Sequence, residues 1–279
     1  MEPTEQMEQT IKLVAIDVDD TLLTPDLRIS LPVQQAIAQA RRQGIAVTLA
    51  TGRMFRATLP YARQLDLDLP LIVYQGAMIK DSATGEVLLH HPVPQDLALE
   101  VFDFLRSEGL HVNIYVDDHL HVEKVGEEAL GYMGLARVPA TLVRDQRRLL
   151  EGALPTKILA IGEPERMAAL VEPCRQRWGD RLYVTRSKPF YLEFMNPWSG
   201  KGSALAFLAE RLGISREAVM VIGDSYNDMD MLEYAGLGVV MGNGPEEVKR
   251  HAGWVAPSNE EDGVAAALCR WALTEKADT

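Results

Sequence analysis

The stretch I-K-L-V-A-I-D-V-D-D-T-L, residues 11–22, decides how the chain folds. Its first part is mostly apolar and rich in β-branched residues, which is typical of a short strand buried on both faces. Asp17, Asp19 and Asp20 stand where this strand ends. Ligands of open α/β sheets bind beyond the carboxyl ends of the strands, so we expect these carboxylates in a binding site. Alternation along the strand points Asp17 and Asp19 to the same side, where two negative charges favour a shared proton or a bound cation.

Strands and helices alternate on both sides of a central block. The first helix is predicted to start at Ser30 and Pro32 and to end at Gly44. Further strands are predicted at 45–50, 71–74, 218–222 and 237–241, and further helices at 54–65, 201–212, 227–235, 245–251 and 262–273. This order predicts an α/β fold with a doubly wound, Rossmann-like parallel sheet.

The central block has a different rhythm. The turn D-S-A-T-G at 81–85 separates two short strands, and hairpins with intervening helices follow. We therefore predict an inserted α+β cap domain over residues 84–190, and a catalytic core built from residues 1–83 and 191–279.

Composition excludes several classes of protein. The 279 residues carry 28 Lys and Arg against 40 Asp and Glu, a net charge of −12, which argues against binding to nucleic acid or anionic membranes. Two cysteines are too few for a disulfide framework. The acidic N-terminal segment 1–10 lacks the layout of a signal peptide, so we expect a cytoplasmic protein. For its oligomeric state we expect either a monomer or a homodimer.

A second acidic cluster, G-D-S-Y-N-D at 223–228, follows a later strand. Asp224 and Asp228 are separated by one helical turn, and carboxylate oxygens of this kind suit Mg²⁺. N-capping of a helix would explain these acids equally well if they stood alone. Two such clusters at strand ends in one chain favour a metal site.

Two further features fit a phosphate group. Thr51, Gly52 and Arg53 follow the strand at 45–50 and offer a hydroxyl, a backbone N–H and a guanidinium group. Lys201 opens a helix after N-P-W-S-G. A phosphate flanked by aspartates needs such a cation to offset the charge.

These motifs resemble, in chain order, the four motifs of the haloacid dehalogenase superfamily of phosphatases. They are D-V-D-D-T (17–21), T-G-R (51–53), Lys201 and G-D-S-Y-N-D (223–228). The position of the insert and the ending M-G-N-G-P-E-E-V-K (241–249) with S-N-E-E-D-G-V (258–264) resemble the Cof-type branch, which has a large α/β cap. That branch usually has glycine at the position of Asp20 and often has asparagine at that of Gln75.

The resemblance implies a role for each motif. Asp17 is implied as the nucleophile that forms an aspartyl-phosphate, and Asp19 as the acid and base. Thr51, Gly52, Arg53, Lys201 and Asn227 are implied as phosphate ligands, with Thr51 and Lys201 also catalytic. The implied Mg²⁺ ligands are Asp17, Asp19 through its carbonyl group, Asp224 and Asp228.

The expected function is therefore Mg²⁺-dependent hydrolysis of a small phosphorylated metabolite, either a sugar phosphate or a cofactor phosphate. A phosphomutase with the same nucleophile is an alternative, because it differs only in where the phosphoryl group goes. A receiver-like signalling domain also combines acids with Thr and Lys, but its phosphorylated aspartate stands alone on a later strand. A binding protein without activity is disfavoured because every expected catalytic side chain is present.

Overall fold

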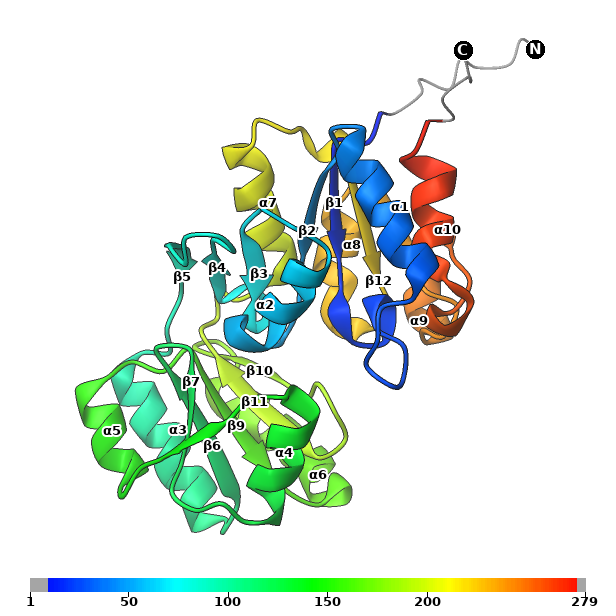
Figure 1. The fold of residues 1–279 in the computed structure, drawn as a ribbon. Coiled ribbons are helices and arrows are strands. Elements are labelled where there is room, and N and C mark those ends of the chain that lie inside the picture. The colour runs from blue at the N-terminus through cyan, green and yellow to red at the C-terminus, as the bar shows by residue number, and fades with distance from the viewer. Residues whose placement is uncertain (1–9, 275–279) are drawn as a thin grey trace.

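Two sheets of different character organise the chain (Figure 1). The computed structural model describes residues 10–274, so most of the N-terminal segment used for the prediction of localisation lies outside the described residues. Among the described residues, no helix combines the length and the apolar character needed to cross a bilayer.

The core sheet is parallel, with the strand order β14-β13-β12-β1-β2. Its strands are β1 (Leu13–Ile16), β2 (Ala46–Leu49), β12 (Val219–Gly223), β13 (Leu237–Val240) and β14 (Trp254–Val255). The first strand lies between β12 and β2, so the chain winds outward from β1 in both directions. The predicted doubly wound fold is confirmed.

Helices cover both faces of this sheet. Val14 and Ile16 of β1 pack with α1 and α10, whereas Leu13 and Ala15 pack with α7 and α8. This alternation explains why the strand sequence is apolar at every position. The helices of the core are α1 (Leu31–Arg42), α2 (Phe55–Gln64), α7 (Lys201–Arg211), α8 (Met229–Tyr234), α9 (Glu246–Lys249) and α10 (Gly263–Trp271). Figure 1 shows α1 beside α10.

Helix α1 illustrates how local sequence sets an element's ends. The Ser30 side chain accepts a hydrogen bond from the Val33 N–H at 3.4 Å, and Pro32 occupies the first turn. Both features were the predicted start signals. Gly44, at φ +82°, takes the left-handed conformation after the last turn.

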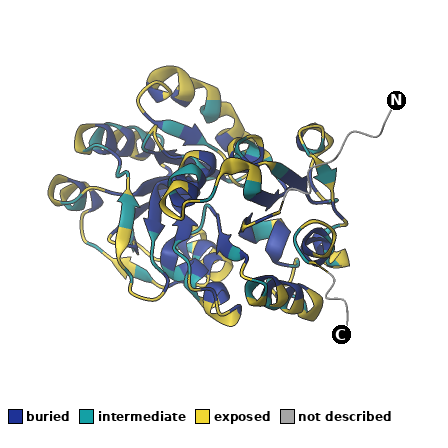
Figure 2. Cartoon of the chain, turned by 90° about the horizontal axis from the view of Figure 1, so that it is seen from above, coloured by how far each residue is buried: buried dark blue, intermediate teal, exposed yellow. Residues whose placement is uncertain are grey.

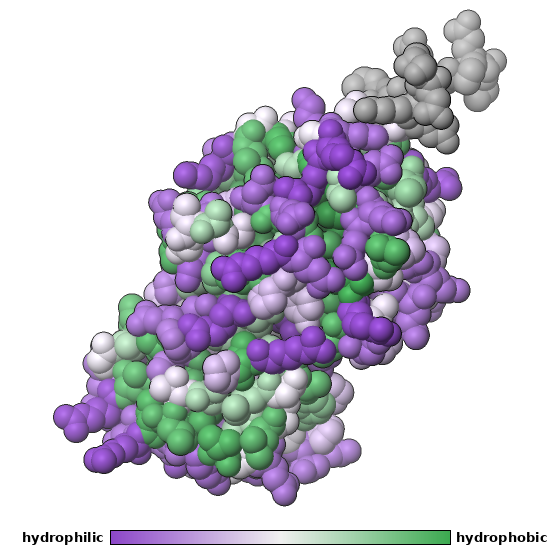
Figure 3. Space-filling view, in the orientation of Figure 1, coloured by the Kyte–Doolittle hydropathy of each residue, from purple (hydrophilic) through white to green (hydrophobic). Residues whose placement is uncertain are grey.

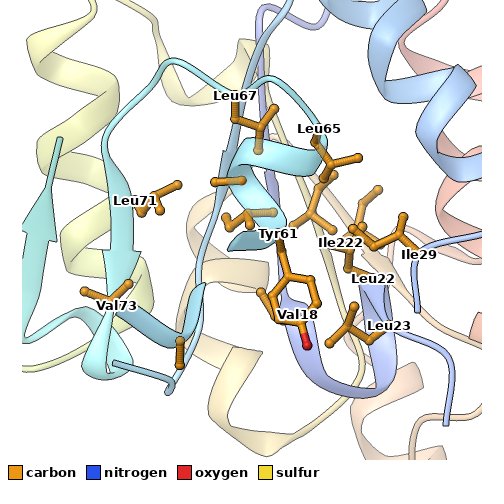
Figure 4. Close-up of a cluster of buried hydrophobic side chains, with 14 of the residues drawn as sticks. Val18, Leu22, Leu23, Ile29, Tyr61, Leu65, Leu67, Leu71, Val73 and Ile222 are labelled. Carbon is orange, nitrogen blue, oxygen red and sulfur yellow. The ribbon is translucent and has the colours of Figure 1, made fainter. Parts of the chain in front are cut away.

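The acidic segment after β1 rests on the hydrophobic core. Val18, Leu22 and Leu23 are buried and belong to the same cluster as Tyr61 of α2 (Figure 4). These side chains anchor both ends of a tight segment, Val18–Leu22, in which Asp20 has a positive φ of 60°. The carboxylates are thereby presented on a rigid support.

A small antiparallel sheet leads out of the core. It consists of β3 (Leu71–Val73), β4 (Met78–Lys80) and β5 (Val87–His90). One parallel bridge between Ala50 and Ile72 joins it to the end of β2.

The inserted module is built on a six-stranded sheet with the order β10-β11-β9-β6-β7-β8. Its strands are β6 (His111–Val116), β7 (His119–Val122), β8 (Ala140–Leu142), β9 (Lys157–Ile161), β10 (Tyr183–Thr185) and β11 (Tyr191–Met195). Its helices are α3 (Gln95–Ser107), α4 (Glu127–Ala136), α5 (Gln146–Gly152) and α6 (Pro164–Trp178). All strand pairs are antiparallel except β7 with β8. The central strands of both sheets are buried, the edge strands β8 and β14 are partly exposed, and the helices expose their outer faces (Figure 2).

Some elements were not predicted. Residues 127–152 form α4, β8 and α5, and β14 adds an edge strand to the core. Helix α4 contains Gly131 and Gly134, which weaken any helical signal. Helix α5 did carry a start signal, because the Asp145 side chain accepts a hydrogen bond from the Arg148 N–H at 3.0 Å.

The division of the chain into core and cap remains a proposal. β5 pairs with β4 beside the core, and β11 pairs with β9 and β10 in the second sheet. On these pairings we propose a cap of residues 91–196, in place of 84–190, because paired strands share one sheet. The chain then crosses from core to cap directly after β5, which is later than the turn at 81–85, and returns to the core directly after β11.

Candidate active site

The site lies at the end of β1, the strand from which the order of the core sheet runs outward in both directions. Asp17 follows β1, Thr51 follows the end of β2, and Asp224 follows β12. These three strands are neighbours in the core sheet, in the order β12-β1-β2. The Asp17 N–H donates to the Ile222 carbonyl oxygen at 2.9 Å, so the two acidic segments are joined directly. This is the point at which open α/β sheets bind ligands.

Lys201 lies at the centre of the acids. Its Nζ donates to Asp17 Oδ1 and to Asp228 Oδ1, each at 2.6 Å, and its side chain is fully buried. Lys201 is the first residue of α7, and Asp230 fixes that end of the helix by accepting from the Gly202 N–H at 2.8 Å. One ammonium group therefore bridges two carboxylates from different motifs.

The segment after β12 is held by its own acids. Asp228 Oδ2 accepts from the N–H groups of Asp224 and Ser225, both at 3.0 Å. Gly223 permits this arrangement, because a Cβ there would lie 2.7 Å from the Asp228 carboxyl carbon. Thr21 Oγ1 donates to Asp224 Oδ1 at 2.8 Å and links this segment to the one after β1. Thr21 belongs to the first motif, D-V-D-D-T, although the motif predicted no role for it.

The cluster holds more negative charge than Lys201 can offset. Asp17, Asp224 and Asp228 each offer a carboxylate oxygen within 4.8 Å of the others, and all three residues are buried. Burial, with the nearby Asp228 and Asp224, raises the pKa of Asp17 well above its usual range although Lys201 opposes this. Burial and Asp228 together raise the pKa of Asp224 to about 7. Hard oxygen donors with excess negative charge fit Mg²⁺.

Asp19 takes a different partner from Asp17. Its two carboxylate oxygens accept from Arg53 Nη2 at 2.6 Å and from Arg53 Nε at 2.8 Å. Burial raises the pKa of Asp19, but the hydrogen bonds and charge of Arg53 outweigh it and lower that pKa. Both Asp17 and Asp19 line the cavity, but the Asp19 side chain is 34% exposed, whereas that of Asp17 is 6% exposed. Asp19 is thus the more accessible of the two to a leaving group.

The loop after β2 is shaped for close approach. Thr51 is buried, and its Oγ1 accepts from the Arg53 N–H at 3.2 Å. A Cβ at Gly52 would lie 2.4 Å from Nε2 of Gln75, so a larger residue would require that amide to move. Gln75 Oε1 accepts from Asn227 Nδ2 at 3.2 Å, which places Asn227 beside the loop.

Tyr74 and Gln75 both have a positive φ, 52° and 55°, a backbone conformation that residues other than glycine rarely adopt. Such strain collects at functional sites. Nε2 of Gln75 and Nη1 of Arg53 are buried without a hydrogen-bond partner, and both residues line the cavity. Two donors are therefore available to a ligand.

A cavity of about 360 Å³ opens above these residues. Its core wall contains the predicted residues Asp17, Asp19, Thr51, Gly52, Arg53, Asp224 and Asn227, while Lys201 and Asp228 lie behind them. Its opposite wall comes from the second sheet and α4, and consists of Tyr132, Leu135, Ala136, Lys157, Leu159, Ser187, Lys188, Tyr191 and Glu193. Figure 3 shows hydrophilic side chains along the junction of the two parts.

Sequence reasoning missed the opposite wall. Lys157 Nζ and Glu193 Oε2 are 3.2 Å apart, and both side chains are 3% exposed. Each is the lone charge within an apolar strand, K-I-L-A-I and Y-L-E-F-M, and that was the available signal. Burial of an unpaired charge is costly, so such a residue indicates a partner across the sheet.

Comparison with known proteins agrees with this geometry. A model of the haloacid dehalogenase-like hydrolases matches residues 14–268. The chain belongs to this family. The resemblance found in the four motifs is thereby confirmed, and the chain is an enzyme, a hydrolase.

Relatives match this chain over nearly their whole length. A Streptococcus pyogenes protein that carries a phosphatase name is 34% identical over 95% of this chain and 99% of its own. The pyridoxal phosphate phosphatase YbhA of Escherichia coli is 28% identical over 92% of this chain and 97% of its own. A crystal structure from Thermotoga maritima superposes with a TM-score of 0.85 at 32% identity, over 96% of this chain and all of that one.

Proposed function

We propose that this hydrolase is a Mg²⁺-dependent phosphatase that releases phosphate from a small phosphorylated metabolite through an aspartyl-phosphate. The observation that supports this best is the position of Lys201, which donates hydrogen bonds of 2.6 Å to both Asp17 and Asp228. It lies beneath a cavity that Asp19 and Thr51 line. Phosphoryl transfer requires positioning and charge neutralisation, and this arrangement offers both.

The first step forms a bond between Asp17 and phosphorus. Lys201 holds Oδ1 of Asp17, so Oδ2 attacks, and the bond from phosphorus to the leaving oxygen breaks. Asp19, protonated in the complex with substrate, gives its proton to that oxygen, so an alcohol leaves. Arg53 holds Asp19 in the free enzyme and must release or share it as the ester binds.

The second step reverses the role of Asp19. It takes a proton from water, whose oxygen attacks phosphorus; the bond to Asp17 breaks, and inorganic phosphate forms. Thr51 and the Gly52 N–H hold the phosphoryl oxygens, with Arg53 Nη1 and Asn227 beside them. The donors for Mg²⁺ are Asp17, Asp224 and the Asp19 carbonyl group. Asp228, whose oxygens already accept from Lys201 and from two backbone N–H groups, orients Lys201 rather than binding the ion directly. The ion neutralises charge on the phosphoryl group when bound.

The substrate is a small metabolite because the cavity is about 360 Å³ and is closed on one side by the cap. A relative named as a pyridoxal phosphate phosphatase supports a cofactor phosphate as one class. A sugar phosphate is the other class that we propose to test. The cytoplasm, and a monomer or homodimer, remain the expected setting.

The test is phosphate release from a panel that contains pyridoxal phosphate, flavin mononucleotide and several sugar phosphates, with Mg²⁺ or with EDTA. We expect turnover of at least one compound with Mg²⁺, none in EDTA, and poor substitution by Ca²⁺, which tolerates the wrong coordination number. Asp17→Asn is expected to abolish turnover of every compound. Undiminished activity in EDTA, or in Asp17→Asn, contradicts the proposal.

A further inference from the structure

One residue of the cap completes a helix of the core. Asp118 lies in the turn between β6 and β7, is buried, and has a φ of 57°. Its Oδ1 accepts from the Phe55 N–H at 3.0 Å and its Oδ2 from the Arg56 N–H at 3.1 Å. These are the first two residues of α2, whose own N-cap residue, Met54, has no side-chain acceptor. Asp118 thus caps a helix of the other part of the molecule.

Asp118 also contacts the strained end of β3. The Tyr74 hydroxyl group donates to Asp118 Oδ1 at 2.9 Å, inside the protein. The Tyr74 N–H donates to the Arg53 carbonyl oxygen at 2.9 Å, and the Gln75 N–H to that of Thr51 at 3.0 Å. The two segments that Asp118 joins are therefore the ones that frame the loop Thr51–Gly52–Arg53.

A second cap side chain binds the same loop with opposite charge. Lys157 Nζ donates to the Gly52 carbonyl oxygen at 3.2 Å. The cap thus places a cation on a carbonyl oxygen of the loop and an anion on the free N–H groups of the helix that follows it. Each charge matches the local backbone polarity.

We propose that Asp118 is a positioning residue that couples docking of the cap to the geometry of the loop at 51–53. This rests on the proposed function, in which that loop holds the phosphoryl group. When the cap moves away, the Asp118 carboxylate and the N–H groups of Phe55 and Arg56 are hydrated separately. Their hydrogen bonds therefore stabilise the docked state and contribute little to the folding of either part.

The kinetic test compares Asp118→Ala with Asp117→Ala. The adjacent Asp117 is a matched control, since it is exposed and also has a positive φ, 49°, so both variants carry the same backbone strain. We expect Asp118→Ala to lower kcat/KM about tenfold relative to the control, the factor typical of a lost helix cap and a buried hydrogen bond. A difference under twofold contradicts the proposal.

The second test needs no turnover, so it separates this proposal from the proposed function. Hydrogen exchange of the Phe55 and Arg56 amides reports docking, and in the wild type we expect it to be at least about tenfold slower than in an unstructured peptide. Tyr74→Phe leaves both acceptor oxygens of Asp118 in place, yet weakens docking and speeds this exchange, whereas Asp117→Ala leaves it unchanged. Free exchange in the wild type, or no effect of Tyr74→Phe, overturns the role of Asp118 even if the enzyme is a phosphatase.

Discussion

Replacing Lys201 by methionine tests the charge balance of the site through stability. Methionine matches the length of most of the lysine side chain but removes the ammonium group. Asp17, Asp224 and Asp228 then face one another within 4.8 Å, with no cation among them. The variant isolates the electrostatic contribution of a single buried charge.

The expected magnitude follows from burial. The side chains of Lys201 and Asp228 are fully buried and that of Asp17 is 6% exposed, so solvent screens the remaining charges poorly. Removing one member of a buried ion pair typically costs about 3–5 kcal/mol of unfolding free energy. Lys249→Met serves as the control, because its partner Glu246 is exposed and such surface pairs often contribute nothing measurable.

The assay is urea unfolding in EDTA, so that no metal replaces the ammonium group. Lys201→Met is expected to lose about 3–5 kcal/mol, and Lys249→Met to resemble the wild type. Adding Asp228→Asn to Lys201→Met removes one of the crowded charges, so the double variant is expected to regain part of the loss. A loss below about 1 kcal/mol for Lys201→Met, or no recovery in the double variant, would refute this account.

Two other variants test separate parts of the molecule. Asp19→Asn is expected to lose about 10²–10⁴-fold more kcat/KM on sugar phosphates than on p-nitrophenyl phosphate, whose leaving group needs no proton; equal losses on both would move the acid role elsewhere. Burial raises the pKa of the Cys174 thiol to about 11, whereas Cys269 is exposed, so a thiol reagent at pH 8 should label one cysteine per native chain. Labelling that persists in Cys269→Ser would contradict the packing of α6.

Much of the core and of the site could be predicted from short segments. Asp17, Asp19, Asp224 and Asp228 each follow an apolar strand within a few residues, and parallel strands end at one edge of a sheet. The residues that face them from the cap could not be predicted in this way. Lys157 and Glu193 are 36 positions apart in strands without a motif, and only the pairing of β9 with β11 brings them together.

By itself, the sequence determined the strand ends that carry acids and the start of α1 at Ser30. These depend on local backbone chemistry, which a few neighbouring residues decide. Only the tertiary structure decided that Arg53 binds Asp19 and that Asp118 caps α2 from 63 residues away. The first contact depends on how two neighbouring strands of the core sheet place their loops, and the second on which surfaces of the two sheets meet; both are decided by the packing of the whole chain.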